Sequence, residues 1–207
     1  VEWRIDCFEG AKDLPAIVHC AAKLRVALKD QLLLFTFRTK AEGGKVALSH
    51  EEYLHFIRVV LATDCADLID IEFFTAGAEL PALIEEAHTA GAAVVCSSHD
   101  FHKTPPRTEL VSRMMQMQRA GADLPKLAVM PQSRTDVLEL LAATAEMADL
   151  HPETPVITMS MGALGAVSRL SGEALGSAMT FANPGQASAP GQVSLEVVNE
   201  VLDALHL

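Results

Sequence analysis

Short apolar runs alternate along the chain with longer segments in which apolar residues recur every three or four positions. The short runs predict strands, and the longer segments predict amphipathic helices. Strict alternation of the two is typical of a parallel sheet whose strands are joined by helical crossovers. The predicted strands span 1–6, 32–38, 68–74, 92–98, 125–131, 154–161 and 177–182, and the predicted helices span 11–28, 51–64, 79–90, 106–120, 134–148, 163–175 and 194–206.

Several predicted strands carry apolar residues on one face and charged residues on the other. In 1–6 every second residue is charged, and the run 69–73 repeats this alternation. In 35–38 two phenylalanines alternate with Thr36 and Arg38. A parallel sheet covered by helices on both faces has almost continuously apolar strands instead. Solvated edge strands of an open sheet would explain one such strand, but not three. A closed barrel explains all of them, because its polar face lines the interior. The pattern therefore predicts an α/β fold of the TIM (β/α)8 barrel type.

The chain length bears on how much of a barrel is present. The 207 residues are enough for a sizeable core, and we expect a single (β/α) barrel domain over 1–207. A TIM barrel has eight strands in about 250 residues, whereas the pattern here gives seven strands, the first of them at residue 1. We therefore expect the first βα unit to be absent. The Gly-, Pro- and Ser-rich stretch 183–194 is a long loop of the kind that is often functional.

The composition and net charge argue against several classes of binding partner. The net charge of −11 argues against nucleic acid and anionic membranes, since both are bound mainly through clustered Lys and Arg. The apolar runs are too short to span a bilayer, and no signal-peptide pattern opens the chain. The four cysteines are scattered without a CxxC pair, which favours reduced thiols and a cytoplasmic location. No GxGxxG, P-loop or GxSxG motif supports nucleotide binding or serine hydrolysis.

Lys126 is the most informative single residue. The alternation within 125–131 places it on the interior face together with Ala128 and Met130. Burial disfavours the charged ammonium, so the amine of an enclosed lysine becomes available as a nucleophile. The alternative is a lysine at a strand start that extends along apolar surface to reach water.

The stretch "VVCSSHDFHKTP" (94–105) brings two histidines and a lysine close together. His99 follows just after the predicted strand and shares its alternation, so we expect it to point inward at the end where barrel enzymes place catalytic groups. His102 and Lys103 come further along and are predicted to lie in a solvated loop. An HxxH pair supplies at most two ligands, so it gives little support for a metal site.

Three arginines are candidates for binding an anion, and two methionines are candidates for packing inside the barrel. Arg4, Arg38 and Arg169 are possible anion ligands, since the guanidinium fork matches a carboxylate. Spacing alone would equally make Arg169 an ordinary charge on a helix surface. Met159 and Met161 are most simply interpreted as packing in the upper barrel.

Eight segments taken together resemble one known family. They are "VEWRID", "FTFRTKAEGG", "DLIDIEFF", "VVCSSHDFHKTP", "LPKLAVMPQ", "ITMSMGALGAVSRLSG", "GSAMTF" and "SAPGQ". They occur in the order found in type I 3-dehydroquinate dehydratases and cover nearly the whole chain. The chain departs from the pattern at Ser98, where many members carry Asn beside the histidine.

The resemblance implies a barrel enzyme of the shikimate pathway, and hence of aromatic amino-acid biosynthesis. Such an enzyme converts 3-dehydroquinate to 3-dehydroshikimate without a metal or an organic cofactor, and homodimers are common in the family. Lys126 would form an imine with the substrate ketone, His99 would act as general acid and base, and Glu42 would orient His99. The implied substrate-binding residues are Arg169 for the carboxylate, Glu2, Arg4 and Arg38 for the ring hydroxyls, Ser188 and Gln192 in a closing loop, and Met159 and Met161 as pocket walls.

Two other interpretations stay open. A dehydroquinate-binding module or fragment without turnover would keep the fold and lose the reaction. An imine-forming barrel of the aldolase type would share the strand lysine, but it would not predict "SSHD", "FTFRTKAEGG" and "SAPGQ" together.

Overall fold

The computed structural model describes residues 1–185 and 189–205. They form two compact units. The N-terminal unit contains 1–98 and 120–123, and the C-terminal unit contains 99–119 and the residues from 124 onward. A single domain over 1–207 stays a prediction.

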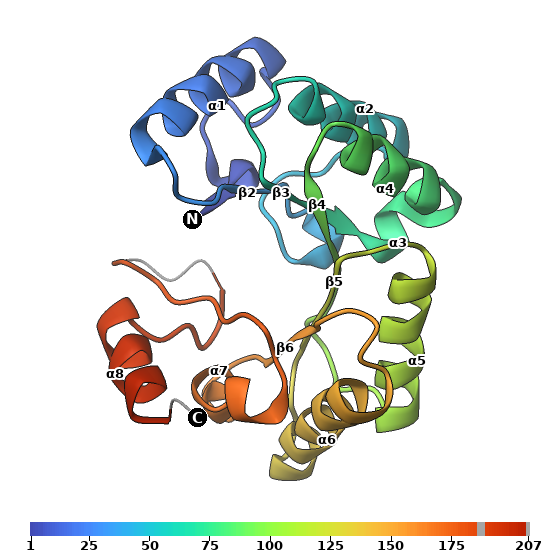
Figure 1. The fold of residues 1–207 in the computed structure, drawn as a ribbon, viewed down its shortest axis with the longest axis vertical. Helices are drawn as coiled ribbons and strands as arrows, with labels where there is room; N and C mark the ends of the chain where they lie inside the picture. The colour runs from blue at the N-terminus through green and yellow to red at the C-terminus, as the bar shows by residue number, and fades with distance from the viewer. Residues whose placement is uncertain (186–188, 206–207) are drawn as a thin grey trace. The chain divides into compact units, whose positions relative to one another are not determined.

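Parallel strands and helical crossovers make up the N-terminal unit. β1 (Glu2–Arg4), β2 (Leu34–Thr36), β3 (Leu68–Glu72) and β4 (Ala93–Asp100) pair in parallel in that order, and β4 runs on into the C-terminal unit at its last two residues. The helices α1 (Leu14–Leu28), α2 (His50–Leu61) and α4 (Leu80–Thr89) connect them and lie on the same side of the strands (Figure 1). The predicted alternation of strands and helices is confirmed here.

Short helical turns close several connections in this unit. They are η1 (Ile5–Cys7), η2 (Lys40–Glu42), α3 (Phe73–Ala76) and η3 (Gly77–Glu79). The prediction that a strand continues to residue 74 is wrong, because α3 begins at Phe73. The hydroxyl of Thr75 donates to the Glu72 carboxylate over 2.6 Å, which folds the chain into a turn directly after β3.

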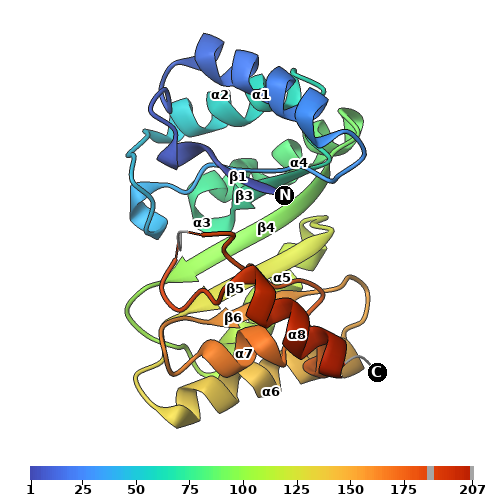
Figure 2. The same cartoon turned by 90° about the vertical axis from the view of Figure 1, so that its left-hand side faces the viewer.

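The C-terminal unit pairs β5 (Leu124–Val129) in parallel with β6 (Ile157–Ser160). Figure 2 shows these strands with the helices of the unit, α5 (Arg107–Arg119), α6 (Arg134–Leu150), α7 (Ala166–Leu170) and α8 (Leu195–Leu205). The predicted helix 163–175 is instead split into α7 and the short η4 (Glu173–Leu175). Gly172 lies at the break, where a side chain would meet the backbone oxygen of Ser168.

The strand predicted over 177–182 is wrong. In the structure this segment forms a single parallel bridge, from Ser177 to Val156, and no strand. The backbone N–H of Thr158 donates to the Ser177 hydroxyl over 3.1 Å instead of to a backbone carbonyl. The Ser177 side chain therefore takes the place of the next backbone hydrogen bond between the two segments.

Opposite faces of the N-terminal strands have opposite character, as the alternation predicts. Trp3, Phe35, Ile69 and Val94 lie in one row across the four strands, and the Trp3 and Phe35 ring centroids are 5.4 Å apart. The neighbouring row contains Arg4, Thr36, Asp70 and Val95, so it carries the polar side chains.

A buried arginine joins the polar side chains of this unit. Arg38 is 3% exposed, and its Nη2 lies 2.8 Å from the Asp70 carboxylate. Its Nη1 lies 2.9 Å from Glu72 and donates to the Ser97 hydroxyl over 2.9 Å. Glu42 lies 3.7 Å from the same nitrogen. Burial by itself lowers the pKa of Arg38, but the nearby carboxylates, Asp70 first, raise it above the ordinary arginine value.

Glu72 fastens neighbouring segments to this cluster. Its carboxylate accepts hydrogen bonds from the backbone N–H of Thr39 over 2.8 Å and from the Thr39 hydroxyl over 2.7 Å. Its own backbone N–H donates to the Tyr53 hydroxyl of α2. The stretch after β2 and the helix α2 are therefore both tied to the end of β3.

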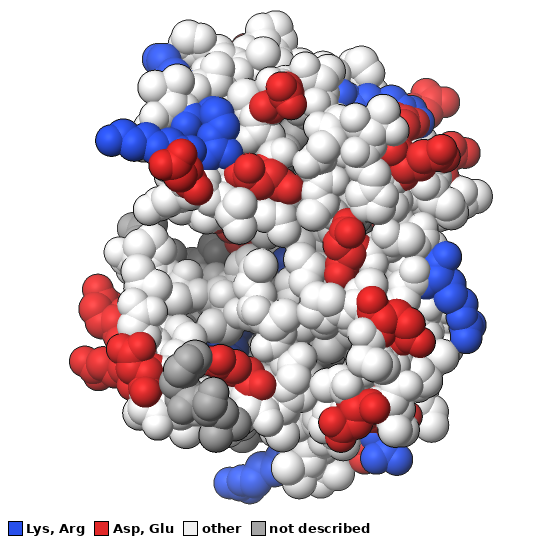
Figure 3. All heavy atoms as spheres, viewed as in Figure 1, with Lys and Arg blue, Asp and Glu red and all other residues white. Residues whose placement is uncertain are grey.

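The surface agrees with the acidic composition. On the face drawn in Figure 3, acidic side chains are scattered over the helices of both units. Among the residues that the structure describes, no helix is long and apolar enough to cross a membrane.

We expect Arg38→Met to lower the free energy of unfolding by about 3–5 kcal/mol, since removing one partner leaves buried carboxylates uncompensated. The measurement is urea unfolding at pH 7 and at pH 5. The loss should be smaller at pH 5, because a buried carboxylate without its cation takes up a proton more readily.

The matched control is Arg58→Met. Arg58 pairs with Glu86 at 2.8 Å, but both side chains are more than two fifths exposed. An exposed pair contributes only about 0–1 kcal/mol. Equal losses in the two variants would show that the Arg38 cluster does not stabilise the fold.

Candidate active site

Lys126 lies in β5 and is 3% exposed. Its Nζ is 4.4 Å from the centroid of the Phe181 ring, within the range of a cation–π interaction. The sheet register places Lys126 beside Ile157 and Ala128 beside Met159, so the lysine and Met159 share one face. The predicted inward direction is confirmed, and the alternative in which the amine reaches water is wrong.

His99 also belongs to the C-terminal unit, and it is half-buried. It lies inside β4 rather than after its end, because the strand continues to Asp100. Ser98, the position that departs from the family pattern, is buried beside it.

The rest of the "SSHDFHKTP" stretch is a loop organised by Asp100. The Asp100 carboxylate accepts the backbone N–H groups of His102 and Lys103 over 2.8 and 3.0 Å. Both side chains are exposed. The prediction of a solvated loop for His102 and Lys103 is therefore confirmed.

Arg169 is a buried cation without an acidic partner among the described residues. It lies in α7 and is 2% exposed, so the alternative of an ordinary surface charge is wrong. Its Nη2 donates to the Pro190 carbonyl over 3.3 Å, its Nη1 lies 3.6 Å from the Met159 sulfur, and its Nε has no hydrogen-bond partner. Burial lowers the pKa of this guanidinium. Such a group suits an anion that arrives from outside the protein.

The described part of the "SAPGQ" segment packs beside Arg169. The backbone N–H of Gly162 donates to the Pro190 carbonyl over 3.3 Å. Gly191 has a φ of +74° and lies so close to the Gly162 backbone that a side chain there would overlap it. Gln192 is half-buried, and Ser188 lies outside the described residues.

The other predicted residues lie on the polar side of the N-terminal unit. Glu2 accepts a hydrogen bond from the Thr36 hydroxyl over 2.8 Å. Arg4 donates through two nitrogens to Asp6, over 2.8 and 2.9 Å. Burial raises the pKa of Asp6, but the Arg4 guanidinium more than offsets this and lowers it. Arg38 and Glu42 belong to the buried cluster described above.

Sequence reasoning missed several partners of these residues. Asp70 and Glu72 were recognised only as the polar half of an alternating strand, although that alternation was the signal for an interior position. Asp6 is likewise a charged residue in an alternating strand pattern, at the end of "VEWRID". No sequence pattern indicated Phe181, because its contact with Lys126 joins segments that are far apart in the sequence.

The whole chain, residues 1–207, matches the family model described as type I 3-dehydroquinase. It is 49% identical over 205 residues to a 3-dehydroquinate dehydratase of Klebsiella pneumoniae (strain 342), covering 99% of this chain and 82% of the relative. It is 48% identical over 206 residues to that of Bacillus subtilis (strain 168), covering all of this chain and 81% of the relative.

Solved structures of 3-dehydroquinate dehydratases also match this chain. The type I 3-dehydroquinate dehydratase of Clostridium difficile matches with a TM-score of 0.95 and 45% identity, over 99% of this chain and 81% of that one. The enzyme of Enterococcus faecalis matches with a TM-score of 0.92 and 40% identity, over 100% of this chain and 82% of that one. The predicted α/β fold class is thereby confirmed as that of these relatives. The chain belongs to the type I 3-dehydroquinase family of 3-dehydroquinate dehydratases.

Proposed function

We propose that this protein dehydrates 3-dehydroquinate to 3-dehydroshikimate through a Schiff base on Lys126. The observation that carries the proposal is a lysine 3% exposed on a strand face that it shares with Met159. An amine in such a place can attack a ketone once it has lost its proton. The C. difficile relative, whose structure is described as having covalent modified comenic acid, supports covalent chemistry within the family.

The steps balance without a metal or an external redox agent. The Lys126 amine adds to the ring ketone, and the adduct loses water to give a protonated imine. The imine draws electrons from the adjacent carbon, which then gives up a proton to a base. The hydroxyl on the next carbon leaves as water after it receives a proton, and a second water hydrolyses the imine to release the product and the lysine.

His99 is proposed as the group that moves these protons. Imidazole exchanges a proton near neutral pH, so one residue can first accept the proton and then return it to the leaving hydroxyl. Its half-buried position on β4 leaves the ring accessible to a bound ligand.

Arg169 is proposed to bind the substrate carboxylate. It is the buried guanidinium to which the described residues offer a carbonyl and a sulfur but no carboxylate. A bidentate pair with the substrate would satisfy the nitrogen that has no partner.

The remaining roles are proposals that rest on the family resemblance. Glu42 would orient His99, and Glu2, Arg4 and Arg38 would hold the ring hydroxyls. Gln192 and Ser188 would contact the substrate from the closing loop, and Met159 and Met161 would form apolar walls. A cytoplasmic homodimer in the shikimate pathway is proposed on the same grounds.

Borohydride should trap the imine. Reduction in the presence of 3-dehydroquinate is expected to add one reduced substrate to the intact chain, and peptide mass spectrometry should place it on Lys126. Lys126→Ala should abolish the adduct. Lys103→Ala is the matched control and should retain it, since Lys103 is exposed in a loop. An adduct on any other lysine would contradict the assignment of the nucleophile.

His99→Ala should separate imine formation from proton transfer. We expect turnover to fall by about 10²–10⁴-fold, the range of general acid–base catalysis, while slow trapping on Lys126 persists. His102→Ala should keep normal turnover. Near-normal turnover of His99→Ala would contradict the assignment of His99 as general acid and base. If the unmodified protein binds 3-dehydroquinate without turning it over, the binding-module interpretation is favoured instead.

A further inference from the structure

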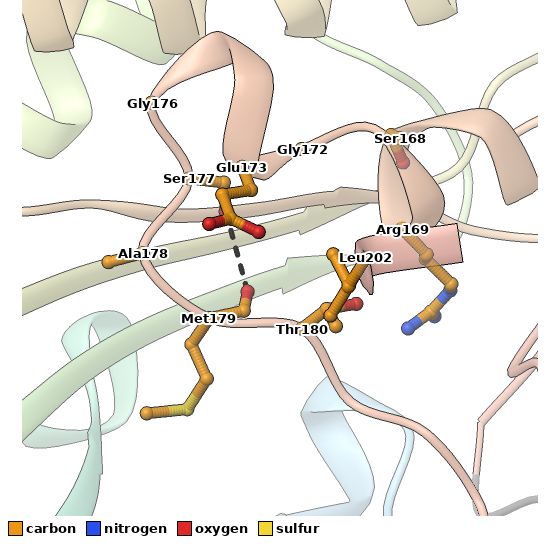
Figure 4. A pocket seen from close by; sticks show the side chains of 10 residues that line it. All are labelled: Ser168, Arg169, Gly172, Glu173, Gly176, Ser177, Ala178, Met179, Thr180 and Leu202. Carbon is orange, nitrogen blue, oxygen red and sulfur yellow. Dashed lines mark hydrogen bonds between the residues drawn. The ribbon is translucent and has the colours of Figure 1, made fainter. Parts of the chain in front are cut away.

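Three arginines are proposed to bind the substrate, and the structure holds each of them differently. Arg169 lines a cavity of about 350 Å³ (Figure 4), and its hydrogen-bond partners among the described residues include no carboxylate. Arg38 has carboxylates at both of its terminal nitrogens. Arg4 is held along one edge by a single carboxylate, that of Asp6. The edge that Asp6 occupies determines which nitrogens of Arg4 remain for a ligand.

The Asp6 carboxylate occupies the edge of the Arg4 guanidinium that contains Nε and Nη2. Nε donates to Oδ1 over 2.8 Å, and Nη2 donates to Oδ2 over 2.9 Å. A guanidinium carries five N–H groups in one rigid plane, so this pairing leaves the edge between Nη1 and Nη2 unused. Among the described residues, Nη1 makes no hydrogen bond, and it is not one of the buried polar atoms without a partner. The unused edge of Arg4 is therefore accessible to a ligand.

Asp6 is itself fixed by the backbone of other segments. It is 2% exposed. Its Oδ2 accepts the backbone N–H of Lys45 over 3.2 Å, and its Oδ1 accepts that of Arg38 over 3.4 Å. Lys45 comes after η2 and Arg38 comes after β2, so the carboxylate is fastened to two segments besides its own. A carboxylate locked in this way holds the paired guanidinium of Arg4 in one orientation.

The charge of the pair indicates what kind of group Arg4 binds. Burial by itself lowers the pKa of Arg4, but the hydrogen bond and the charge of Asp6 raise it by more. The guanidinium is thus charged and already neutralised by its neighbour, unlike that of Arg169. A neutralised guanidinium attracts a second carboxylate only weakly, yet its N–H groups still donate strong hydrogen bonds to an uncharged oxygen. Arg4 therefore suits a hydroxyl group, whereas Arg169 suits the substrate carboxylate.

We propose that Asp6 is a positioning residue for substrate binding. It holds the edge of Arg4 that contains Nε and Nη2, so that the opposite edge donates to a hydroxyl of the substrate ring. By neutralising the guanidinium it also directs Arg4 toward a hydroxyl and away from the carboxylate. Asp6 acts through Arg4 and does not touch the substrate. The inference rests on the proposed function, in which Arg4 contacts the ring of 3-dehydroquinate.

The test is a double-mutant cycle, with the binding of 3-dehydroquinate measured by calorimetry in a Lys126→Ala background, where no imine forms. Arg4→Ala and Asp6→Asn should each weaken binding by about tenfold, the value of one hydrogen bond to a charged donor. The variant with both changes should bind within about twofold of Arg4→Ala alone, because Asp6 acts through Arg4. A double variant weakened by the product of the two losses would overturn the proposal, and so would normal binding in Asp6→Asn.

Asp67→Asn is the matched control. Asp67 also pairs with an arginine, Arg25, at 2.6 Å, and it also accepts a backbone N–H, that of Leu33, over 2.7 Å. It precedes β3, whereas Asp6 follows β1, so the two residues lie at opposite ends of the parallel strands. Asp67→Asn should leave binding within about twofold of the background. A loss as large as that of Asp6→Asn would assign the effect to general loosening of the unit and overturn the proposal.

Arg4→Lys tests the geometry without a change in Asp6. An ammonium keeps the charge and can pair with Asp6, but it has no rigid second edge for a ligand. Arg4→Lys should therefore bind about as weakly as Arg4→Ala, and binding equal to that of the background would overturn the proposal.

Borohydride trapping on Lys126 is measured separately, in the protein that retains this lysine. A reduced adduct together with normal binding in Arg4→Ala would overturn the role of Asp6 and leave the proposed reaction standing. The expected losses of binding without an adduct would support the role of Asp6 and contradict the reaction. Failure of the one and failure of the other can therefore be told apart.

Discussion

The ion cluster around Arg38 is the constraint on which the N-terminal unit depends. Alternation along β3 sends Asp70 and Glu72 to the same buried face, where two carboxylates side by side would repel each other. One guanidinium contacts both. Glu72 also accepts hydrogen bonds from Thr39, which fastens the segment that leads to Glu42. Glu72 therefore helps to place the segment that carries Glu42, the residue proposed to orient His99.

The two buried arginines differ in a way that indicates function. Arg38 and Arg169 are almost equally inaccessible, at 3% and 2% exposed. Arg38 is neutralised by carboxylates of its own unit, and its pKa is raised. Among the described residues, the hydrogen-bond partners of Arg169 are a carbonyl and a sulfur and no carboxylate, and burial lowers its pKa. A protein tolerates an uncompensated buried charge when something outside the fold compensates it, so Arg169 is the better choice for an anion ligand.

The sequence predicted the features that follow from periodicity. Alternation in three strands gave the buried polar face, and it gave the direction of Lys126 within "PKLAVMP". It did not give the contacts that depend on distant segments, such as Phe181 beneath Lys126 or Pro190 beside Arg169. The end of β3 was missed for a similar reason. The strand ends where the Thr75 hydroxyl donates a hydrogen bond to the Glu72 carboxylate, and an alternating pattern does not predict that contact.

The segment 177–182 shows where local propensity stops being sufficient. "SAMTFA" has the residues of a strand, yet a strand exists only where its backbone groups have partners. Here one neighbour supplies a single bridge, and the Ser177 side chain replaces the next rung. Phe181 nevertheless lies beside Lys126, so the segment already contributes to the surroundings of the proposed nucleophile.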